Sequence, residues 1–280
     1  MTCAFRLVDV FSETAYRGNP LAVVHDAEGL STEEMQAITR WLNLSETTFL
    51  LPPTAVGADY RVRIFTLDRE LPFAGHPTLG SCHAWLEAGG APRTPGEVIQ
   101  ECGAGLIPIR REPGALAFAA PPVLRAGTLE REKLAEVLDF LRLSPAKVIE
   151  ARWIDNGPGW MGILLDSAEA VLAVDAARSH PGRIEVGLVG PHPAGAPCAF
   201  EIRALFSDQH GGVREDPVTG SLNASVAQWL FETGRATGAY RAAQGTKIGY
   251  EGRIRLRQDT AGAVWVGGAT RTMFVGKMAD

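Results

Sequence analysis

The chain has 280 residues, of which 46% are apolar and 21% are charged, a composition typical of a globular protein with one large or two medium domains. Its formal net charge is −5 and Lys and Arg form no block, so nucleic acid and anionic membrane surfaces are poor candidates for partners. No apolar stretch reaches membrane-spanning length, the N-terminus has no signal-peptide pattern, and the four cysteines form no Cys-x-x-Cys pair. These features favour a cytoplasmic protein with no disulfide framework, metal site or membrane partner.

The first elements expected along the chain are two strands at 7–11 and 21–24, with an Asn-Pro turn between them. Ser31 and Glu34 have the spacing of a capping box, which predicts the start of a helix. A strand over 47–51 follows this helix. Four apolar side chains of the helix recur at helical spacing and should share one face: Met35, Ile38, Trp41 and Leu42.

The stretch FAGHPTLGS (73–81) predicts the start of a second, largely apolar helix that ends at Gly89-Gly90. Pro77 lacks an N–H group and suits the first helical position, which would make His76 the N-cap residue. Histidine is not among the residues that commonly cap helices, so a functional role for His76 is as reasonable as a packing role.

The remaining pattern is rich in short strands. A strand is expected at 101–109, where Cys102 is interpreted as structural, and another within 114–122 closes the first half. An amphipathic helix is expected at 129–142, and a buried helix in the second half at 221–234. Further strands are expected at 160–166, 185–191, 199–206, 254–258 and 263–268.

An internal repeat relates the two halves of the chain. Residues 63–84 align without gaps with residues 203–224, and both segments contain a strand, a loop, a Pro and a Gly-Ser pair before an apolar helix. The alignment pairs His76 with Asp216, so a titratable residue is expected at the N-cap of a buried helix in each half. Helix N-termini bind carboxylates and oxyanions, although ordinary capping is the alternative role for Asp216.

Five segments, in this order, resemble the phenazine-biosynthesis PhzF-like family over nearly the whole chain: VDVFSETAYRGNPLAVV, LNLSETTFLLPP, RIFTLDRELPFAGHPTLGSCHAWL, ECGAG and EDPVTGSLNASVAQWL. The resemblance implies the α+β fold of diaminopimelate epimerase, with two similar domains that are each a β-barrel wrapped around a central helix. We place the domains at 1–122, to which residues 270–280 return, and at 123–269. A homodimer and an active site between the domains are also implied.

The founding member of the family isomerises trans-2,3-dihydro-3-hydroxyanthranilate without a cofactor, through a glutamate that removes a proton and returns it elsewhere. By resemblance, the catalytic residues here are Glu46, His76 and Asp216. The resemblance also implies that a substrate carboxylate or developing oxyanion binds at two turns and beside the glutamate: Ser45, Gly75, Pro77, Thr78, Thr219, Gly220 and Ser221.

Three functions remain open from the sequence. The first is a cofactor-independent isomerase that moves a proton on a small carboxylated, cyclic substrate, with Glu46 as the shuttle. The second is an amino-acid racemase or epimerase that uses Glu46 and His76 as its two bases. Related racemases carry a cysteine at each of the two helix starts, and this chain does not. The third is a metabolite-binding protein without catalytic activity.

Overall fold

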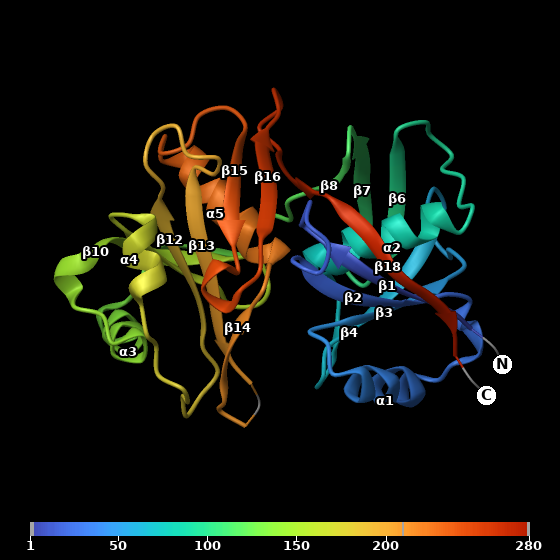
Figure 1. Cartoon of the computed structure of the whole chain (residues 1–280), viewed down its shortest axis with the longest axis horizontal. Coiled ribbons are helices and arrows are strands. Elements are labelled where there is room, and N and C mark those ends of the chain that lie inside the picture. The colour runs from blue at the N-terminus through green and yellow to red at the C-terminus, as the bar shows by residue number, and fades with distance from the viewer. Residues whose placement is uncertain (1–2, 209, 279–280) are drawn as a thin grey trace. The chain divides into compact units, whose positions relative to one another are not determined.

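The computed structural model describes residues 3–208 and 210–278, and the chain divides into two compact units (Figure 1). Unit 1 runs to Ala119 and resumes at Gly267, and unit 2 comprises Ala120–Val266. No helix among the described residues has the length and apolarity needed to cross a membrane.

Unit 1 has one central helix, α2, with strands both before it and after it in the sequence. Its elements are β1 (Ala4–Val10), β2 (Asn19–Val24), α1 (Thr32–Leu42), β3 (Thr47–Leu51), β4 (Tyr60–Phe65), β5 (Glu70–Leu71), α2 (Gly75–Glu87), β6 (Glu97–Cys102), β7 (Gly105–Glu112), β8 (Ala115–Ala119) and β18 (Thr270–Lys277).

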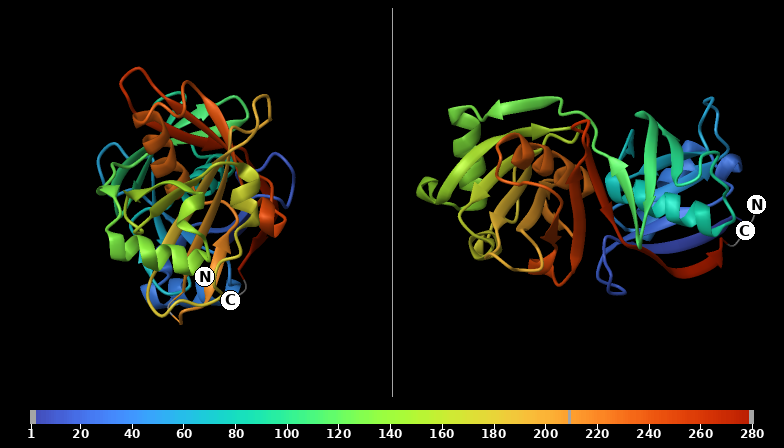
Figure 2. Two further views of the ribbon diagram at one scale, coloured as in Figure 1. Left: turned by 90° about the vertical axis from the view of Figure 1, so that its left-hand side faces the viewer. Right: turned by 90° about the horizontal axis from the view of Figure 1, so that it is seen from above.

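The strands of unit 1 surround α2. β1 pairs antiparallel with both β2 and the C-terminal strand β18, which lies beside it in Figure 2. β2 runs parallel to β3, and β4 runs parallel to β6, while the remaining neighbours are antiparallel. Strands β1, β2, β3, β6, β8 and β18 all contact α2. The approach is close, because a Cβ added at Gly80 would lie 2.5 Å from Cδ2 of Leu21 on β2.

Unit 2 has the same arrangement around its own central helix. Its elements are β9 (Arg125–Thr128), α3 (Arg131–Leu141), β10 (Val148–Asp155), β11 (Met161–Leu165), α4 (Ala168–Ala173), β12 (Glu185–Pro191), β13 (Phe200–Ser207), β14 (Val213–Asp216), α5 (Gly220–Glu232), β15 (Tyr240–Gln244), β16 (Gly252–Gln258) and β17 (Val264–Gly268), whose last two residues belong to unit 1.

The two units repeat one pattern of strand pairing. In unit 1, β1–β2 is antiparallel, β2–β3 parallel, β3–β4 antiparallel and β4–β6 parallel. Unit 2 has the same sequence of pairings in β10–β11, β11–β12, β12–β13 and β13–β15. A Cβ at Gly187 would lie 2.4 Å from Cδ1 of Leu222, so α5 approaches β12 as closely as α2 approaches β2. The expected fold of two similar domains, each with strands wrapped around a helix, is therefore confirmed.

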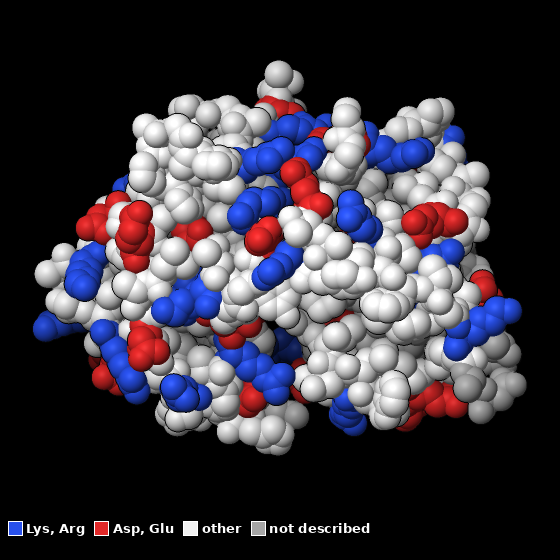
Figure 3. All heavy atoms as spheres, viewed as in Figure 1, with Lys and Arg blue, Asp and Glu red and all other residues white. Residues whose placement is uncertain are grey.

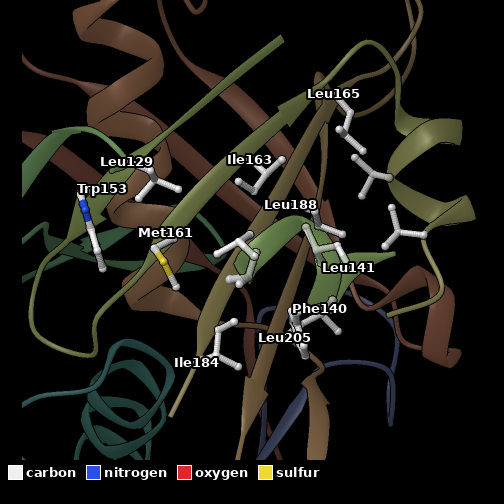
Figure 4. Packing of buried hydrophobic residues seen from close by; sticks show 14 residues of the cluster. Leu129, Phe140, Leu141, Trp153, Met161, Ile163, Leu165, Ile184, Leu188 and Leu205 are labelled. Carbon is white, nitrogen blue, oxygen red and sulfur yellow. The ribbon is translucent and has the colours of Figure 1, made fainter. Parts of the chain in front are cut away.

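A hydrophobic core in unit 2 lies between α3, α4 and the strands β10 to β13 (Figure 4). Phe140 and Leu141 of α3 point toward Leu188 and Leu205 of the sheet in that view. On the surface, basic and acidic side chains lie interspersed over the face shown in Figure 3. Arg253, Arg255 and Arg257 alternate on β16 with residues that are buried.

The central helices begin at other residues than the sequence predicts. Ala74 is the N-cap of α2, so His76 is its second residue and Pro77 its third. The first three N–H groups of any helix have no intrahelical partner, and proline therefore fits the third position as well as the first. Thr219 is the N-cap of α5, while Asp216 is the last residue of β14.

The helix starts also correct the repeat alignment. Gly75 and Gly220 are 145 positions apart rather than 140, because the connection between strand and helix is longer in unit 2. His76 consequently corresponds to Ser221, and its pairing with Asp216 was wrong. A gapless alignment follows the strands and misses an insertion that lies between strand and helix.

Two other sequence predictions were wrong in detail. Trp41 is 84% exposed, and Thr39 takes its place on the buried face of α1 beside Met35. The strand expected at 101–109 is a β6–β7 hairpin, because Gly105 adopts a φ of 101° that turns the chain. The strand at 47–51 and the capping box of Ser31 and Glu34 are confirmed.

Candidate active site

Glu46 and His76 lie side by side in unit 1. Glu46 immediately precedes β3, and His76 is in the first turn of α2. The Ser81 hydroxyl of α2 donates to Thr48 Oγ1 of β3 at 2.8 Å, which ties the helix to the strand. His76 Nε2 lies 3.5 Å from Glu46 Oε2. Ser45, the neighbour of Glu46, is half-buried.

Burial determines the charge of the imidazole in this pair. The side chain of His76 is 4% exposed and that of Glu46 is 16% exposed. Burial lowers the pKa of His76 to about 3, so the imidazole is neutral at physiological pH. The contact is therefore one between a neutral ring and a carboxyl group. A neutral imidazole can donate or accept a hydrogen bond beside a carboxylate without adding net charge.

The start of α2 leaves backbone N–H groups without intrahelical partners. Ala74 offers no side-chain acceptor to the first turn, and the amides of Gly75 and His76 have no intrahelical partner. Pro77 has no N–H, and the amide of Thr78 is already bonded to the Ala74 carbonyl at 3.1 Å. Of the four predicted residues of this turn, Gly75 and His76 are thus the two with an amide available for an anion.

Asp216 is connected to the start of α5 in unit 2. The Thr219 hydroxyl donates to Asp216 Oδ2 at 2.6 Å. Gln244 completes the arrangement, since its Nε2 donates to the Asp216 carbonyl at 3.1 Å and its Oε1 accepts from the Thr219 amide at 3.0 Å. Asp216 therefore holds the N-cap residue of α5 in place instead of capping the helix itself.

The first turn of α5 also presents amides. Those of Gly220 and Ser221 have no intrahelical partner, because the first bond of the helix is made by the Asn223 amide to the Thr219 carbonyl. The Ser221 hydroxyl accepts a hydrogen bond from Trp160 Nε1 at 3.0 Å. The first turn of α2 thus has two such amides and that of α5 has three, because Leu222 of α5 stands where α2 has Pro77.

Sequence reasoning missed three buried polar residues around these helix starts. Asn19 Nδ2 lies 3.4 Å from His76 Nδ1. Gln100 bonds Thr78 on α2, and Gln244 bonds Asn223 at the corresponding turn of α5. The signal available in the sequence is a polar side chain within a strand. For Asn19 this signal is weak, because an Asn before a Pro is also explained by a turn.

Cys82 and Cys102 are not activated as nucleophiles. Cys82 is fully buried inside α2, and burial raises its pKa to about 12. Cys102 is half-buried, and its pKa is also raised by burial. Over residues 3–208 and 210–278, no three His, Cys, Asp or Glu side chains cluster in a way that could hold a metal ion.

The chain is similar over its whole length to proteins of one family. A family model described as "Phenazine biosynthesis-like protein" matches residues 8–276. The chain is 47% identical to a protein named as an uncharacterized isomerase of Mesorhizobium japonicum, over 92% of this chain and 91% of that protein. It is 32% identical to trans-2,3-dihydro-3-hydroxyanthranilate isomerase of Pseudomonas aeruginosa, over 91% and 90%. A PhzF-family structure from Enterococcus faecalis, 21% identical, superposes over 100% of both chains with a TM-score of 0.80.

Proposed function

Because this chain belongs to the phenazine biosynthesis-like family, we propose that it is a cofactor-independent isomerase that moves a proton within a small carboxylated, cyclic substrate. Full-length similarity to proteins named as isomerases supports the reaction class. The observation that carries the proposal is the pair of Glu46 and His76, in which a carboxyl group of low exposure faces a neutral imidazole at a helix start.

Glu46 acts as the proton shuttle in this proposal. Its carboxylate takes a proton from one carbon of the substrate, holds it as a carboxylic acid and delivers it to another carbon. The negative charge left on the substrate spreads toward an electron-accepting group such as a carboxylate. The amides of Gly75 and His76 can stabilise that charge, since helix N-termini favour anions.

The substrate class follows from the relatives. The Pseudomonas aeruginosa relative is named for trans-2,3-dihydro-3-hydroxyanthranilate, a carboxylated cyclic diene. We propose a substrate of this class for the present chain. In unit 2, Asp216 and the amides of Gly220 and Ser221 are proposed to contribute an acid–base group and anion-binding donors. Asp216→Asn is the variant that tests that role.

A racemase that uses two thiols is not favoured by the helix starts. The second residue of α2 is His76 and the second residue of α5 is Ser221, so neither first turn offers a cysteine. Incubation with a panel of L-amino acids in D₂O tests the alternative. Exchange at Cα with loss of optical rotation would replace the isomerase proposal by a racemase that uses other bases.

The main test uses Glu46→Gln, which keeps the size of the side chain and removes its basicity. General acid–base catalysis contributes about 10²–10⁴-fold, so kcat should fall by at least about 100-fold on trans-2,3-dihydro-3-hydroxyanthranilate or a related carboxylated diene. Glu33→Gln is the matched control, because Glu33 is exposed on α1 of the same unit, and it should retain full activity. Wild-type turnover by Glu46→Gln would remove Glu46 from the mechanism.

The isotope content of the product tests the shuttle itself. A proton that stays on one carboxyl group between the two carbons is partly protected from solvent exchange. In D₂O, the product should therefore retain part of the substrate hydrogen at the new position. Complete deuteration at that position in a single turnover would show that the proton exchanges with solvent before it is returned.

A further inference from the structure

Asn19, His76 and Glu46 form a line of three side chains in unit 1. Asn19 Nδ2 lies 3.4 Å from His76 Nδ1 on one side of the ring. On the other side, His76 Nε2 lies 3.5 Å from Glu46 Oε2. One nitrogen of the imidazole therefore faces the NH₂ group of an amide, which donates, and the other faces a carboxyl group, which accepts when it is ionised.

The amide determines which ring nitrogen carries the proton. An NH₂ group donates and cannot accept, so the Nδ1 atom of His76 accepts from Asn19 Nδ2. A neutral imidazole has one proton, which then resides on Nε2. Within the part of the chain that the structure describes, no group completes a hydrogen bond to His76 Nε2, and Glu46 Oε2 lies 3.5 Å from it.

The backbone around Asn19 leaves the amide little freedom. Asn19 is fully buried and pairs with Val10 in the β1–β2 ladder. Pro20 restricts the residue before it to extended conformations. Gly18 is equally constrained, since a Cβ at this position would lie 2.2 Å from the Val10 carbonyl oxygen. The backbone that carries Asn19 is therefore fixed in place, and the buried side chain lies against the edge of the imidazole.

We infer that Asn19 is a positioning residue that holds His76 in the Nε2–H tautomer, so that the imidazole donates toward Glu46 and cannot accept a proton from it. The inference rests on the proposed function for its catalytic consequence. The proton that leaves the substrate carbon forms an O–H bond on Glu46, and it returns from that oxygen to the second carbon. His76 takes no part as a relay, because its Nε2 has no lone pair available.

Nuclear magnetic resonance tests the tautomer directly, without substrate. In protein labelled with ¹⁵N-histidine, the His76 signals are assigned by their loss in His76→Gln. We expect Nε2 to give the chemical shift of a protonated ring nitrogen and Nδ1 that of an unprotonated one. The reverse pattern, or an average of the two, would overturn the inference. If the ¹⁵N pattern is as expected but the protein isomerises no substrate, the proposed function is refuted and the inference about the tautomer stands.

The variant Asn19→Asp tests the role of the amide. A carboxylate can only accept, so Nδ1 of His76 should become protonated and its ¹⁵N signal should move to the chemical shift of a protonated ring nitrogen. Loss of such an orienting partner typically costs about 10- to 100-fold in activity, and here it should appear in kcat rather than KM. Asn43→Asp is the matched control, because Asn43 is exposed at the C-cap of α1. An unchanged His76 pattern in Asn19→Asp would show that Asn19 does not set the tautomer.

Discussion

Replacing Gln244 by leucine should destabilise unit 2 by an amount that can be worked out from its hydrogen bonds. The fully buried amide accepts from the Thr219 amide at 3.0 Å and from Asn223 Nδ2 at 2.7 Å. It also donates to the Asp216 carbonyl at 3.1 Å and to Thr219 Oγ1 at 2.9 Å. At about 1 kcal/mol of net stabilisation each, these four bonds amount to about 4 kcal/mol.

The counterpart in unit 1 provides a matched control. Gln100 is also fully buried, but its bonds to the Tyr60 hydroxyl at 2.7 Å and to Thr78 Oγ1 at 3.0 Å involve side chains and no backbone group. We expect Gln100→Leu to cost about half as much as Gln244→Leu, because no backbone amide or carbonyl loses its partner.

Hydrogen exchange measures the two units separately. A loss of about 4 kcal/mol corresponds to a nearly 1,000-fold larger population of the open state, since each 1.4 kcal/mol is tenfold. The amides of α5 should therefore exchange about 1,000-fold faster in Gln244→Leu, while those of α2 keep their wild-type rates. Equal effects of Gln244→Leu and Gln100→Leu on their own units would refute the reasoning.

Two further predictions concern stability. Burial and the Arg6 guanidinium, 2.8 Å from Nε2, lower the pKa of His25 to about 4. The folded pKa lies below the unfolded value of about 6.5, so up to about 3 kcal/mol of stability present above that pH is lost as the pH falls toward 4. Urea unfolding between pH 7 and 4 should show a shallower decline for His25→Gln, and an equal decline would contradict this. Gly190→Ala should cost about 1–3 kcal/mol, because its Cβ would lie 2.2 Å from the Ser167 carbonyl oxygen. Gly276→Ala is the control, because its Cβ would meet no described atom within 4 Å. Urea midpoints that fall equally in both variants would refute the steric argument.

Local physical chemistry is readable in the sequence, and most elements were predicted from it. The capping box at Ser31 requires only residues three positions apart, and the strand at 47–51 follows from a continuous apolar run. Internal similarity correctly predicted two units of one fold, because each unit must bury its own apolar helix. The exposed Trp41 shows the limit of such patterns, since the spacing of apolar residues is compatible with more than one choice of the buried face of a helix.

The positions of the helix starts depended on information that is not local. Proline is acceptable at any of the first three helical residues, so Pro77 alone could not decide whether His76 caps α2 or lies inside it. At α5, Asp216 is a good capping residue by type, yet it pairs with Ala204 as the last residue of a strand. Cross-strand pairing there outweighed the local preference for a cap.

The sequence by itself determined the type of chemistry, whereas tertiary structure decided which groups meet. Glu46 and His76 were candidates by resemblance, and they meet because α2 packs against β3, where Ser81 bonds Thr48. Asn19 reaches His76 across 57 positions of sequence, through a ladder that sets the start of β2 beside the first turn of α2. Contacts of this kind leave no periodic or local signal, since they arise only after the strands have paired around the helix.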